Sequence, residues 1–251
     1  MMIAFAIYFL ILGLVCGSFF NVVGLRVPAK QSLIHPPSHC TSCNTRLRKR
    51  ELVPLFSYLF AKGRCRHCGV SVSPLYPIGE VVTGLLFMLM FVRFGASLEL
   101  LTALLLASLS IIITVSDLKY MLIPNKILAA FVPLLLISRL LHHDQPLWHY
   151  LIGALLGGGM LLLVHLVSRG QMGLGDAKLF FVCGLAIGIP HILVAMLLAC
   201  LAGTIIGVAL QLLHLVKRKQ PIPFGLFLAL GTLAAYLYGD TLIEGYLNII
   251  T

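Results

Sequence analysis

Long runs of apolar residues recur along the whole chain and are separated by short polar connections. A helix that crosses a bilayer needs about 20 apolar residues, so each long run predicts one membrane span. The expected spans cover residues 2–25, 76–94, 98–116, 122–141, 147–168, 177–190, 191–215 and 224–239. The sixth span is short, and its boundary at Pro190 is left open. The predicted fold is an all-α integral membrane protein, a polytopic bundle of about eight transmembrane helices.

The composition agrees with a membrane protein and excludes two other classes. Residues of the AVILMFWYC set make up 60% of the 251 residues, charged residues make up only 10%, and the mean hydropathy is +1.04. Soluble domains are roughly a quarter charged and about half apolar. A single soluble domain and a disordered chain are therefore excluded. The first span is longer than the apolar part of a cleaved signal peptide, so we expect it to remain as an anchor.

Most of the positive charge lies in one loop between the first two expected spans. The net charge is +10, and residues 26–74 carry +8 of it, because the basic residues there are opposed by Glu51 alone. These basic residues are Arg26, Lys30, Arg46, Arg48, Lys49, Arg50, Lys62, Arg64 and Arg66. A basic loop beside a span favours the cytoplasmic side and attracts anionic membrane lipid. Nucleic acid is not an expected partner, because no basic stripe interleaved with aromatic residues is present.

The orientation of the remaining connections follows from a cytoplasmic loop 26–75. Alternation of the spans places connections 117–121, 169–176 and 217–223 on the cytoplasmic side, and these connections also contain Lys and Arg residues. Both termini are then extracytoplasmic.

Four of the seven cysteines form two CxxC units in the basic loop. Cys40 and Cys43 make the first unit, and Cys65 and Cys68 make the second after an interval of 21 residues. This spacing is typical of a tetrahedral four-cysteine zinc site, and persistent disulfides are not expected in the cytoplasm. The sequence predicts one structural zinc ion per chain, with a redox role for the thiols as the alternative. Three nearby histidines are surplus to the four-cysteine shell and are not expected to be ligands: His35, His39 and His67.

Two aspartates lie at the cytoplasmic ends of expected spans. Asp117 follows the third span, and Asp176 opens the sixth within the segment Gly173-Leu174-Gly175-Asp176-Ala177-Lys178. A carboxylate beside hydrocarbon is costly and marks a functional candidate. Two carboxylates in one wet cavity could share a proton, so that one activates water and the other protonates a departing amine. The alternative is that each aspartate only pairs with the lysine two residues later, Lys119 or Lys178.

Other polar and small residues near these aspartates are weaker candidates. Gly173 and Gly175 would let the backbone and a substrate approach the Asp176 carboxylate closely. Glu80 enters the second span near the cytoplasm and is expected to contact substrate or cofactor, with pairing to a basic loop residue as the alternative. Asn21, in the first span, is expected to form a hydrogen bond between helices.

The motifs taken together resemble those of the type IV prepilin leader peptidases, also called prepilin peptidase/N-methyltransferases. The matching segments, in the family's order, are Gly17-Ser18-Phe19-Phe20-Asn21-Val22-Val23, Arg26-Val27-Pro28, the two CxxC units, Tyr76-Pro77-Ile78-Gly79-Glu80, Asp117 with Ile123-Pro124-Asn125, Gly173-x-Gly175-Asp176-x-Lys178, Pro223-Phe224-Gly225 and Ala229-Leu230-Gly231. They span nearly the full length of the chain. One departure is Leu226, which stands where many relatives have a second proline.

The resemblance implies an aspartic endopeptidase of the bacterial cytoplasmic (inner) membrane. Such an enzyme removes the basic leader of type IV prepilins and pseudopilins, and it methylates the new N-terminal amine with S-adenosylmethionine. By position, Asp117 and Asp176 match the family's catalytic aspartates. The implied domains are a first transmembrane helix at 1–25, a zinc-binding and methyltransferase-associated loop at 26–75, and a peptidase bundle at 76–251.

Two other function classes are compatible with parts of the pattern. A transporter could use the two aspartates for proton coupling, but carboxylates at one membrane face rather than at the midplane argue against it. A membrane-anchored zinc adaptor without catalysis would leave the Gly-x-Gly-Asp segment unexplained.

Overall fold

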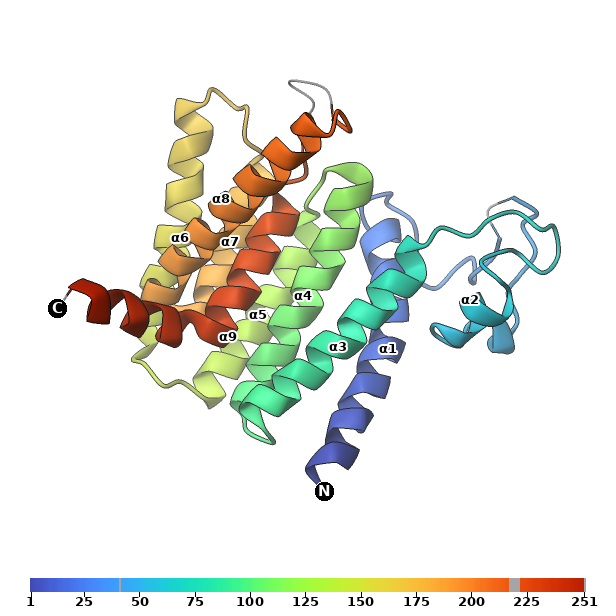
Figure 1. Ribbon diagram of the computed structural model, residues 1–251, viewed down its shortest axis with the longest axis horizontal. Helices are drawn as coiled ribbons and strands as arrows, with labels where there is room; N and C mark the ends of the chain where they lie inside the picture. The colour runs from blue at the N-terminus through green and yellow to red at the C-terminus, as the bar shows by residue number, and fades with distance from the viewer. Residues whose placement is uncertain (41, 217–221, 251) are drawn as a thin grey trace. The chain divides into compact units, whose positions relative to one another are not determined.

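The chain folds into helices that correspond to all eight expected spans. The computed structural model describes residues 1–40, 42–216 and 222–250, and within them every named element is helical (Figure 1). Two compact units divide the chain, residues 1–100 and residues 101–251. The first contains α1 (Met2–Arg26), the 3-10 helix η1 (Lys49–Glu51), α2 (Phe56–Phe60) and α3 (Leu75–Phe94). The second contains α4 (Glu99–Tyr120), whose first residues lie at the boundary, α5 (Asn125–Leu141), α6 (Leu147–Val167), α7 (Leu174–Ile187), α8 (Ile189–Leu212) and α9 (Gly225–Ile250).

The predicted all-α membrane fold is confirmed. Within the described ranges, six helices are long and apolar enough to cross a membrane: α1, α3, α4, α6, α8 and α9. The helices α5 and α7 are shorter, with 17 and 14 residues. Most of the connection expected at 217–223 lies outside the described residues.

In the first unit, α1 and α3 lie side by side because small residues let their backbones meet. A Cβ atom on Gly13 would lie 2.7 Å from the Cα of Gly84, so this position accepts only glycine. Near the other end of the pair, Asn21 donates from Nδ2 to the carbonyl of Tyr76 over 2.9 Å. The hydrogen bond between helices expected for Asn21 is therefore confirmed.

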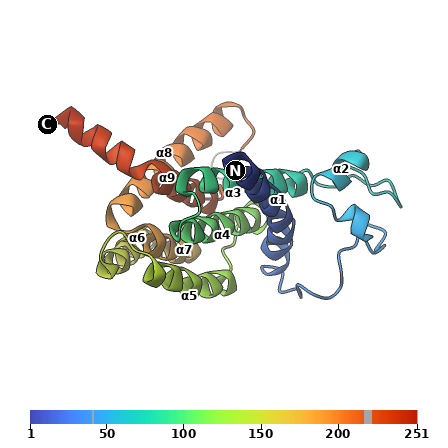
Figure 2. The same cartoon turned by 90° about the horizontal axis from the view of Figure 1, so that it is seen from below.

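In the second unit, α7 is the central helix and contacts α5, α6, α8 and α9 (Figure 2). Its buried residues run without interruption from Val182 to Ile187. Close packing against α6 depends on glycine, since a Cβ atom on Gly153 would lie 2.7 Å from the backbone of Gly188. Glycine at position 153 therefore allows the close contact between α6 and the end of α7.

A buried arginine of α5 supports the end of α7. Arg139 is only 4% exposed, donates from Nε to the carbonyl of Ala186 over 2.8 Å, and lies 4.6 Å from the centre of the Tyr150 ring. A positive charge at the C-terminus of a helix is favourable, because the last carbonyl groups there have no partner within the helix. Arg139 thereby fixes the end of α7 that is opposite Asp176.

The last helix continues beyond the residues that hydropathy assigns to the membrane. The expected span ended at residue 239, before Asp240, whereas α9 runs to Ile250. Asp240 does not end the helix, because its carboxylate lies 3.1 Å from Nε2 of His191 on α8. Hydropathy thus locates the apolar part of this helix but not its end.

Candidate functional site

Asp117 lies in the last turn of α4, with its carboxylate against the first turn of α9. It is 5% exposed, and its Oδ2 accepts a hydrogen bond from the backbone N–H of Leu226 over 3.3 Å. A Cβ atom on Gly225 would lie 2.8 Å from the same oxygen. Glycine at this position therefore leaves room for the carboxylate, and the free N–H groups of the helix N-terminus face a negative group.

Asp176 lies in the first turn of α7 and is positioned by the two glycines of its motif. A Cβ atom on Gly173 would lie 3.1 Å from Oδ2 of Asp176, so the carboxylate rests against a bare backbone. A Cβ atom on Gly175 would lie 3.0 Å from the side chain of Ile123. Gly173 thus makes room for the carboxylate, whereas Gly175 makes room for the connection between α4 and α5.

The side chain of Ile123 lies between the surroundings of Asp117 and those of Asp176. Its Cδ1 atom would lie 3.2 Å from a Cβ atom on Gly225, and its Cβ atom would lie 3.0 Å from a Cβ atom on Gly175. One side chain therefore packs between the glycine beside Asp117 and the glycine beside Asp176. The two carboxylates are also close enough for the charge of Asp117 to act on Asp176.

A single cavity of about 1150 Å³ exposes both aspartates. It is lined by the ends of α4 and α7, by α6 and α8, and by the connections around residues 121–123, 168–173 and 222–224. Its other polar lining groups include Asn125, Ser168, Gln171 and Lys178. The described parts of the three connections that were expected on one side of the membrane thus meet at one end of the second unit. The lining thus includes residues beyond the two helices, α4 and α7, that carry the aspartates.

The structure does not support the alternative in which each aspartate pairs with the lysine two residues later. Lys178 donates from Nζ to Oδ1 of Asn125 over 3.1 Å. Among the described residues, no ion pair joins Asp117 to Lys119 or Asp176 to Lys178. The second unit therefore brings five of the candidate residues together around one cavity: Asp117, Asp176, Gly173, Gly175 and Lys178. Both carboxylates remain open to that cavity.

Glu80 belongs to the first unit. It is 8% exposed, and its Oε2 accepts a hydrogen bond from the backbone N–H of Leu55 over 2.7 Å. Leu55 has a φ of 60°, a strained value for leucine that this buried hydrogen bond helps to hold. In this structure Glu80 ties the basic loop to the start of α3.

The four loop cysteines come together as the sequence predicted. Cys40, Cys43, Cys65 and Cys68 have Sγ atoms that all lie within 4.8 Å of one another. The two CxxC units fold alike: Asn44 donates its backbone N–H to Cys40, and Gly69 donates its backbone N–H to Cys65. Asn44 and Gly69 both have positive φ values, 54° and 74°. Two matching turns that present four sulfurs form a cluster able to hold one tetrahedral zinc ion.

Hydrogen bonds within the turns favour thiolates, the form that binds metal, at Cys65 and Cys43, whereas the pKa of Cys68 is raised to about 11. Backbone hydrogen bonds from Cys68 and His67 lower the pKa of the Cys65 thiol. Thr45, whose hydroxyl lies 3.2 Å from Sγ of Cys43, lowers the pKa of that thiol to about 6. All seven cysteines are free in this structure.

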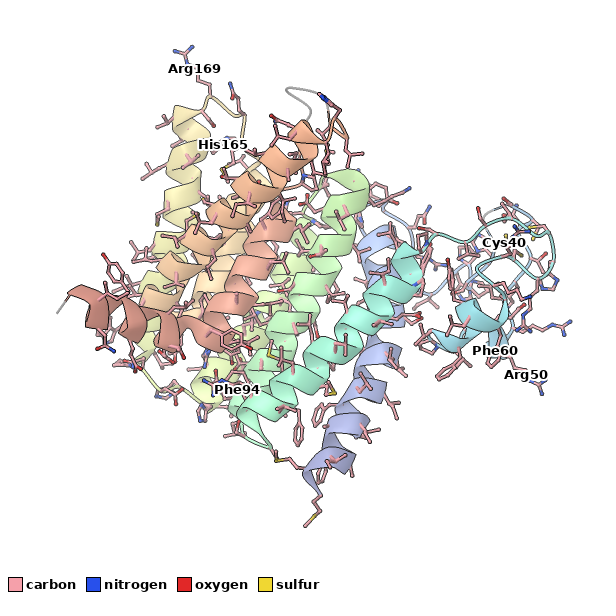
Figure 3. All side chains as sticks on the ribbon, in the orientation of Figure 1. Cys40, Arg50, Phe60, Phe94, His165 and Arg169 are labelled. Atoms are coloured by element: carbon pink, nitrogen blue, oxygen red, sulfur yellow. The ribbon has the colours of Figure 1, made fainter. Side chains whose placement is uncertain are left out.

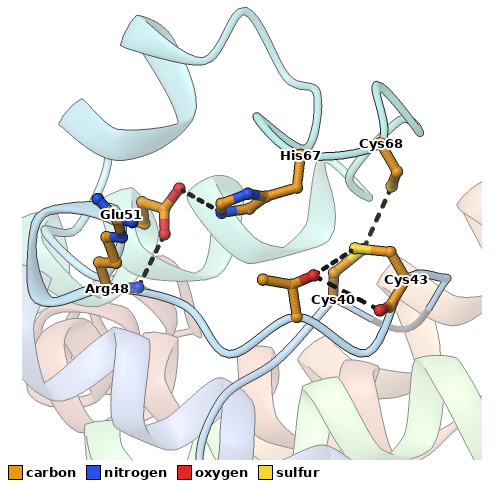
Figure 4. A network of polar contacts seen from close by, with 7 residues as sticks. Cys40, Cys43, Arg48, Glu51, His67 and Cys68 are labelled. Carbon is orange, nitrogen blue, oxygen red and sulfur yellow. Dashed lines mark hydrogen bonds and ion pairs between the residues drawn. The ribbon is translucent and has the colours of Figure 1, made fainter.

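His67 is next to the sulfurs but is engaged elsewhere. Figure 4 shows its ring directed at Glu51, with Nε2 3.6 Å from Oε1, while the other carboxylate oxygen accepts the backbone N–H of Arg48 over 2.8 Å. The Glu51 carboxylate therefore links the second turn to the segment after the first turn.

Three residues of the site were not predicted as members of it. Asn125 and Gly225 stand in two of the segments that carry the family resemblance, Ile123-Pro124-Asn125 and Pro223-Phe224-Gly225, but the sequence gives them no role. Ile123 carried no signal of its own, because an isoleucine beside a membrane span is ordinary. Their contacts join residues about fifty to a hundred positions apart, and no local pattern encodes them.

The fold and the two sites together define a multi-pass membrane protein with paired carboxylates in one cavity and a four-cysteine loop. Comparison with known proteins agrees: residues 11–94 match the bacterial peptidase A24 N-terminal domain, and residues 104–208 match the type IV leader peptidase family. No solved structure matches the chain.

Several relatives are similar over nearly the whole chain. A prepilin leader peptidase/N-methyltransferase of Bacillus subtilis (strain 168) is 40% identical over 239 residues, which cover 95% of this chain and 96% of the relative. Proteins of the same name from Aeromonas salmonicida (strain A449) and Dickeya chrysanthemi are 33% and 32% identical, and the matches cover 98% and 88% of this chain and 94% and 88% of the relatives. The chain belongs to the type IV leader peptidase family. It is therefore a multi-pass protein of the inner membrane.

Proposed function

We propose that this protein is a membrane aspartic endopeptidase that removes the basic leader of type IV prepilins and pseudopilins at the cytoplasmic side. The observation that carries the proposal is the cavity that exposes Asp117 and Asp176 together at one end of the second unit. Relatives of similar length named prepilin leader peptidase/N-methyltransferase support the substrate class.

The two carboxylates supply acid–base chemistry in this proposal. Two carboxylates at short range cannot both ionise cheaply, so the pair holds one proton. The ionised member takes a proton from a water molecule that attacks the scissile carbonyl, and the protonated member gives its proton to the departing amine. Gly173 leaves the backbone beside Asp176 bare, which gives an extended substrate strand room next to the carboxylate.

The sidedness follows from charge. The loop at 26–75 carries most of the net positive charge, and Lys and Arg next to spans remain cytoplasmic. The same rule keeps a basic leader in the cytoplasm while the apolar helix behind it lies in the bilayer. The scissile bond then reaches the cavity at the membrane boundary, and both termini of this chain are extracytoplasmic.

Labelling of introduced cysteines tests the sidedness. Gln171→Cys places a thiol in the lining of the cavity, and His143→Cys places one in the connection between α5 and α6. With a membrane-impermeant reagent added outside intact cells, we expect reaction at His143→Cys and none at Gln171→Cys. The reverse pattern would show that the cavity opens away from the cytoplasm.

The second half of the proposal is methylation of the new N-terminal amine with S-adenosylmethionine as methyl donor. In this proposal the loop 26–75 serves methyl transfer, and its four cysteines hold one structural zinc ion. The loop follows a first transmembrane helix at 1–25, and the peptidase bundle comprises residues 76–251. The two matching turns and their close sulfurs fit zinc. Zinc would hold the two turns together, because a small loop without a core of its own needs such a link.

One experiment tests both activities. The purified chain in detergent is given a prepilin and radiolabelled S-adenosylmethionine, and the product is followed by mass and by label. We expect the mature, methylated pilin from wild type and uncleaved prepilin from Asp176→Asn. Cleavage by Asp176→Asn at the wild-type rate would refute the assignment of the catalytic pair.

A further inference from the structure

The basic loop exposes an apolar surface that nothing in the first unit covers. The surface consists of Leu52, Val53, Phe56, Leu59 and Phe60, on α2 and the residues before it, and each is at least 43% exposed. Phe60 is the most exposed of them, at 76%. Five large apolar side chains gathered on a short segment mark an interaction surface rather than the scattered exposure of ordinary surface residues.

The opposite side of α2 is turned inward, so the helix is amphipathic. The Tyr58 hydroxyl donates to the carbonyl of Val72 over 3.5 Å and lies beside Gly63. Within α2 the exposed residues are Phe56, Leu59 and Phe60, and the segment Phe56–Phe60 contains no charged residue. The apolar face is therefore fixed outward by contacts on the other face.

The depth of α2 relative to the membrane follows from its link to α3. Leu55, which precedes α2 directly, is bonded to the carboxylate of Glu80 over 2.7 Å. Glu80 is the sixth residue of α3 and lies about 8 Å along the helix from its start at Leu75. Since α3 is a candidate membrane span, this link places the start of α2 near one end of that span.

The direction of the surface agrees with this depth. Figure 3 shows Phe60 on the side of the loop toward which α1 and α3 extend, and Cys40 on the other side. Basic side chains accompany the apolar face: Arg48, Arg50 and Lys62 are exposed and lie within a few residues of it. Apolar residues beside Lys and Arg are the composition that binds an anionic membrane interface.

We propose that residues 52–60 form an interfacial anchor that inserts Phe56, Leu59 and Phe60 into the cytoplasmic leaflet, with the neighbouring basic residues on anionic headgroups. The partner is the lipid surface itself. The anchor holds the four-cysteine loop against the membrane at a fixed depth. The choice of the cytoplasmic leaflet rests on the orientation given with the proposed function, whereas insertion into a lipid surface does not depend on it.

The test uses the full chain with a fluorescent reporter in the anchor. The chain has one tryptophan, Trp148, and a Trp148→Phe background leaves room for Phe60→Trp as a conservative reporter. Ser42→Trp is the matched control, because Ser42 is an exposed loop position beside Cys40. Each protein is reconstituted in vesicles of phosphatidylcholine and phosphatidylglycerol, with and without bromine on the acyl chains near the headgroup.

We expect the emission of Phe60→Trp to be blue-shifted and strongly quenched by brominated lipid, and that of Ser42→Trp to be quenched only by iodide in the water. Omitting phosphatidylglycerol should weaken the quenching of Phe60→Trp. Quenching of Phe60→Trp by iodide but not by brominated lipid would place the surface in water and overturn the proposal. Shielding from both quenchers would overturn it as well, since protein would then cover the surface. If the quenching of Phe60→Trp were the same with and without phosphatidylglycerol, the choice of anionic lipid as the partner would be overturned.

Discussion

Gly225→Ala is the substitution that tests the placement of Asp117 most directly. A Cβ atom at this position would lie 2.8 Å from Oδ2 of Asp117, whereas ordinary contact begins at 3.4 Å. The carboxylate is the end of a short side chain and must retreat by roughly half an ångström to regain normal contact. A misplacement of about 1 Å can cost about 10²-fold in rate, so a displacement of half that size should cost about tenfold if the loss scales with distance.

The loss should appear in the rate of leader cleavage and not in folding. Alanine is a better helix former than glycine, so Gly225→Ala should not lower the unfolding temperature. Gly159→Ala is the matched control, because a Cβ atom on Gly159 of α6 meets nothing within 4 Å. The assay is prepilin cleavage by each purified variant, together with its thermal unfolding. Wild-type cleavage by Gly225→Ala would refute the inference that this glycine is required by the Asp117 carboxylate.

Three further predictions concern the aspartates, the cysteines and the buried arginine. Asp117→Asn and Asp176→Asn should each lower cleavage by about 10²- to 10⁴-fold, and the double variant should be barely slower than either, because the pair acts as one unit. Cys65→Ser should abolish zinc binding, measured by metal analysis, and should weaken methylation more than cleavage, because the loop loses its link. Arg139→Met should lower the free energy of unfolding by about 1–3 kcal/mol, measured by thermal denaturation, because the Ala186 carbonyl loses a charged hydrogen-bond donor.

The controls for these three differ. Additive losses in the double Asp variant would contradict a shared proton. If purified wild-type protein contained no zinc, the prediction of a zinc site in the loop would be wrong, whatever the phenotype of Cys65→Ser. Lys126→Met changes an exposed cation on the same helix as Arg139 and should leave stability unchanged. Equal stability of the Arg139 and Lys126 variants would contradict the support of α7 by Arg139.

The membrane helices could be predicted from the sequence because each requires a long apolar run, and the bilayer imposes that length. The end of α9 could not, since Asp240 stops the apolar run without stopping the helix. The helix α2 could not be predicted either. It is five residues long and owes its position to the hydrogen bond between Leu55 and Glu80, which joins residues 25 positions apart.

The candidate site likewise contains residues that could be predicted from the sequence and residues that could not. Asp117, Asp176 and the four cysteines could be named because a carboxylate beside hydrocarbon and a repeated CxxC are unusual in sequence. The role of Gly225 could not be named, because its reason is a carboxylate 108 positions earlier in the chain, and the contact exists only in the folded protein. Glu80 is a third case. Its position near a span end suggested a contact with substrate or cofactor, or a pair with a basic loop residue. In the structure its carboxylate accepts a hydrogen bond from the backbone N–H of Leu55, a partner that the sequence did not indicate.

The shortness of α7 has a consequence for how the protein meets bilayers of different thickness. Fourteen residues span about 21 Å, against a hydrocarbon core of about 30 Å. A lipid-facing helix of that length would suffer hydrophobic mismatch and would tilt or thin the bilayer around it. Because α7 is enclosed by α5, α6, α8 and α9, its height is set by the Gly153 contact and by Arg139 rather than by lipid. Asp176 therefore keeps its depth within the second unit when the membrane around the outer helices thickens or thins.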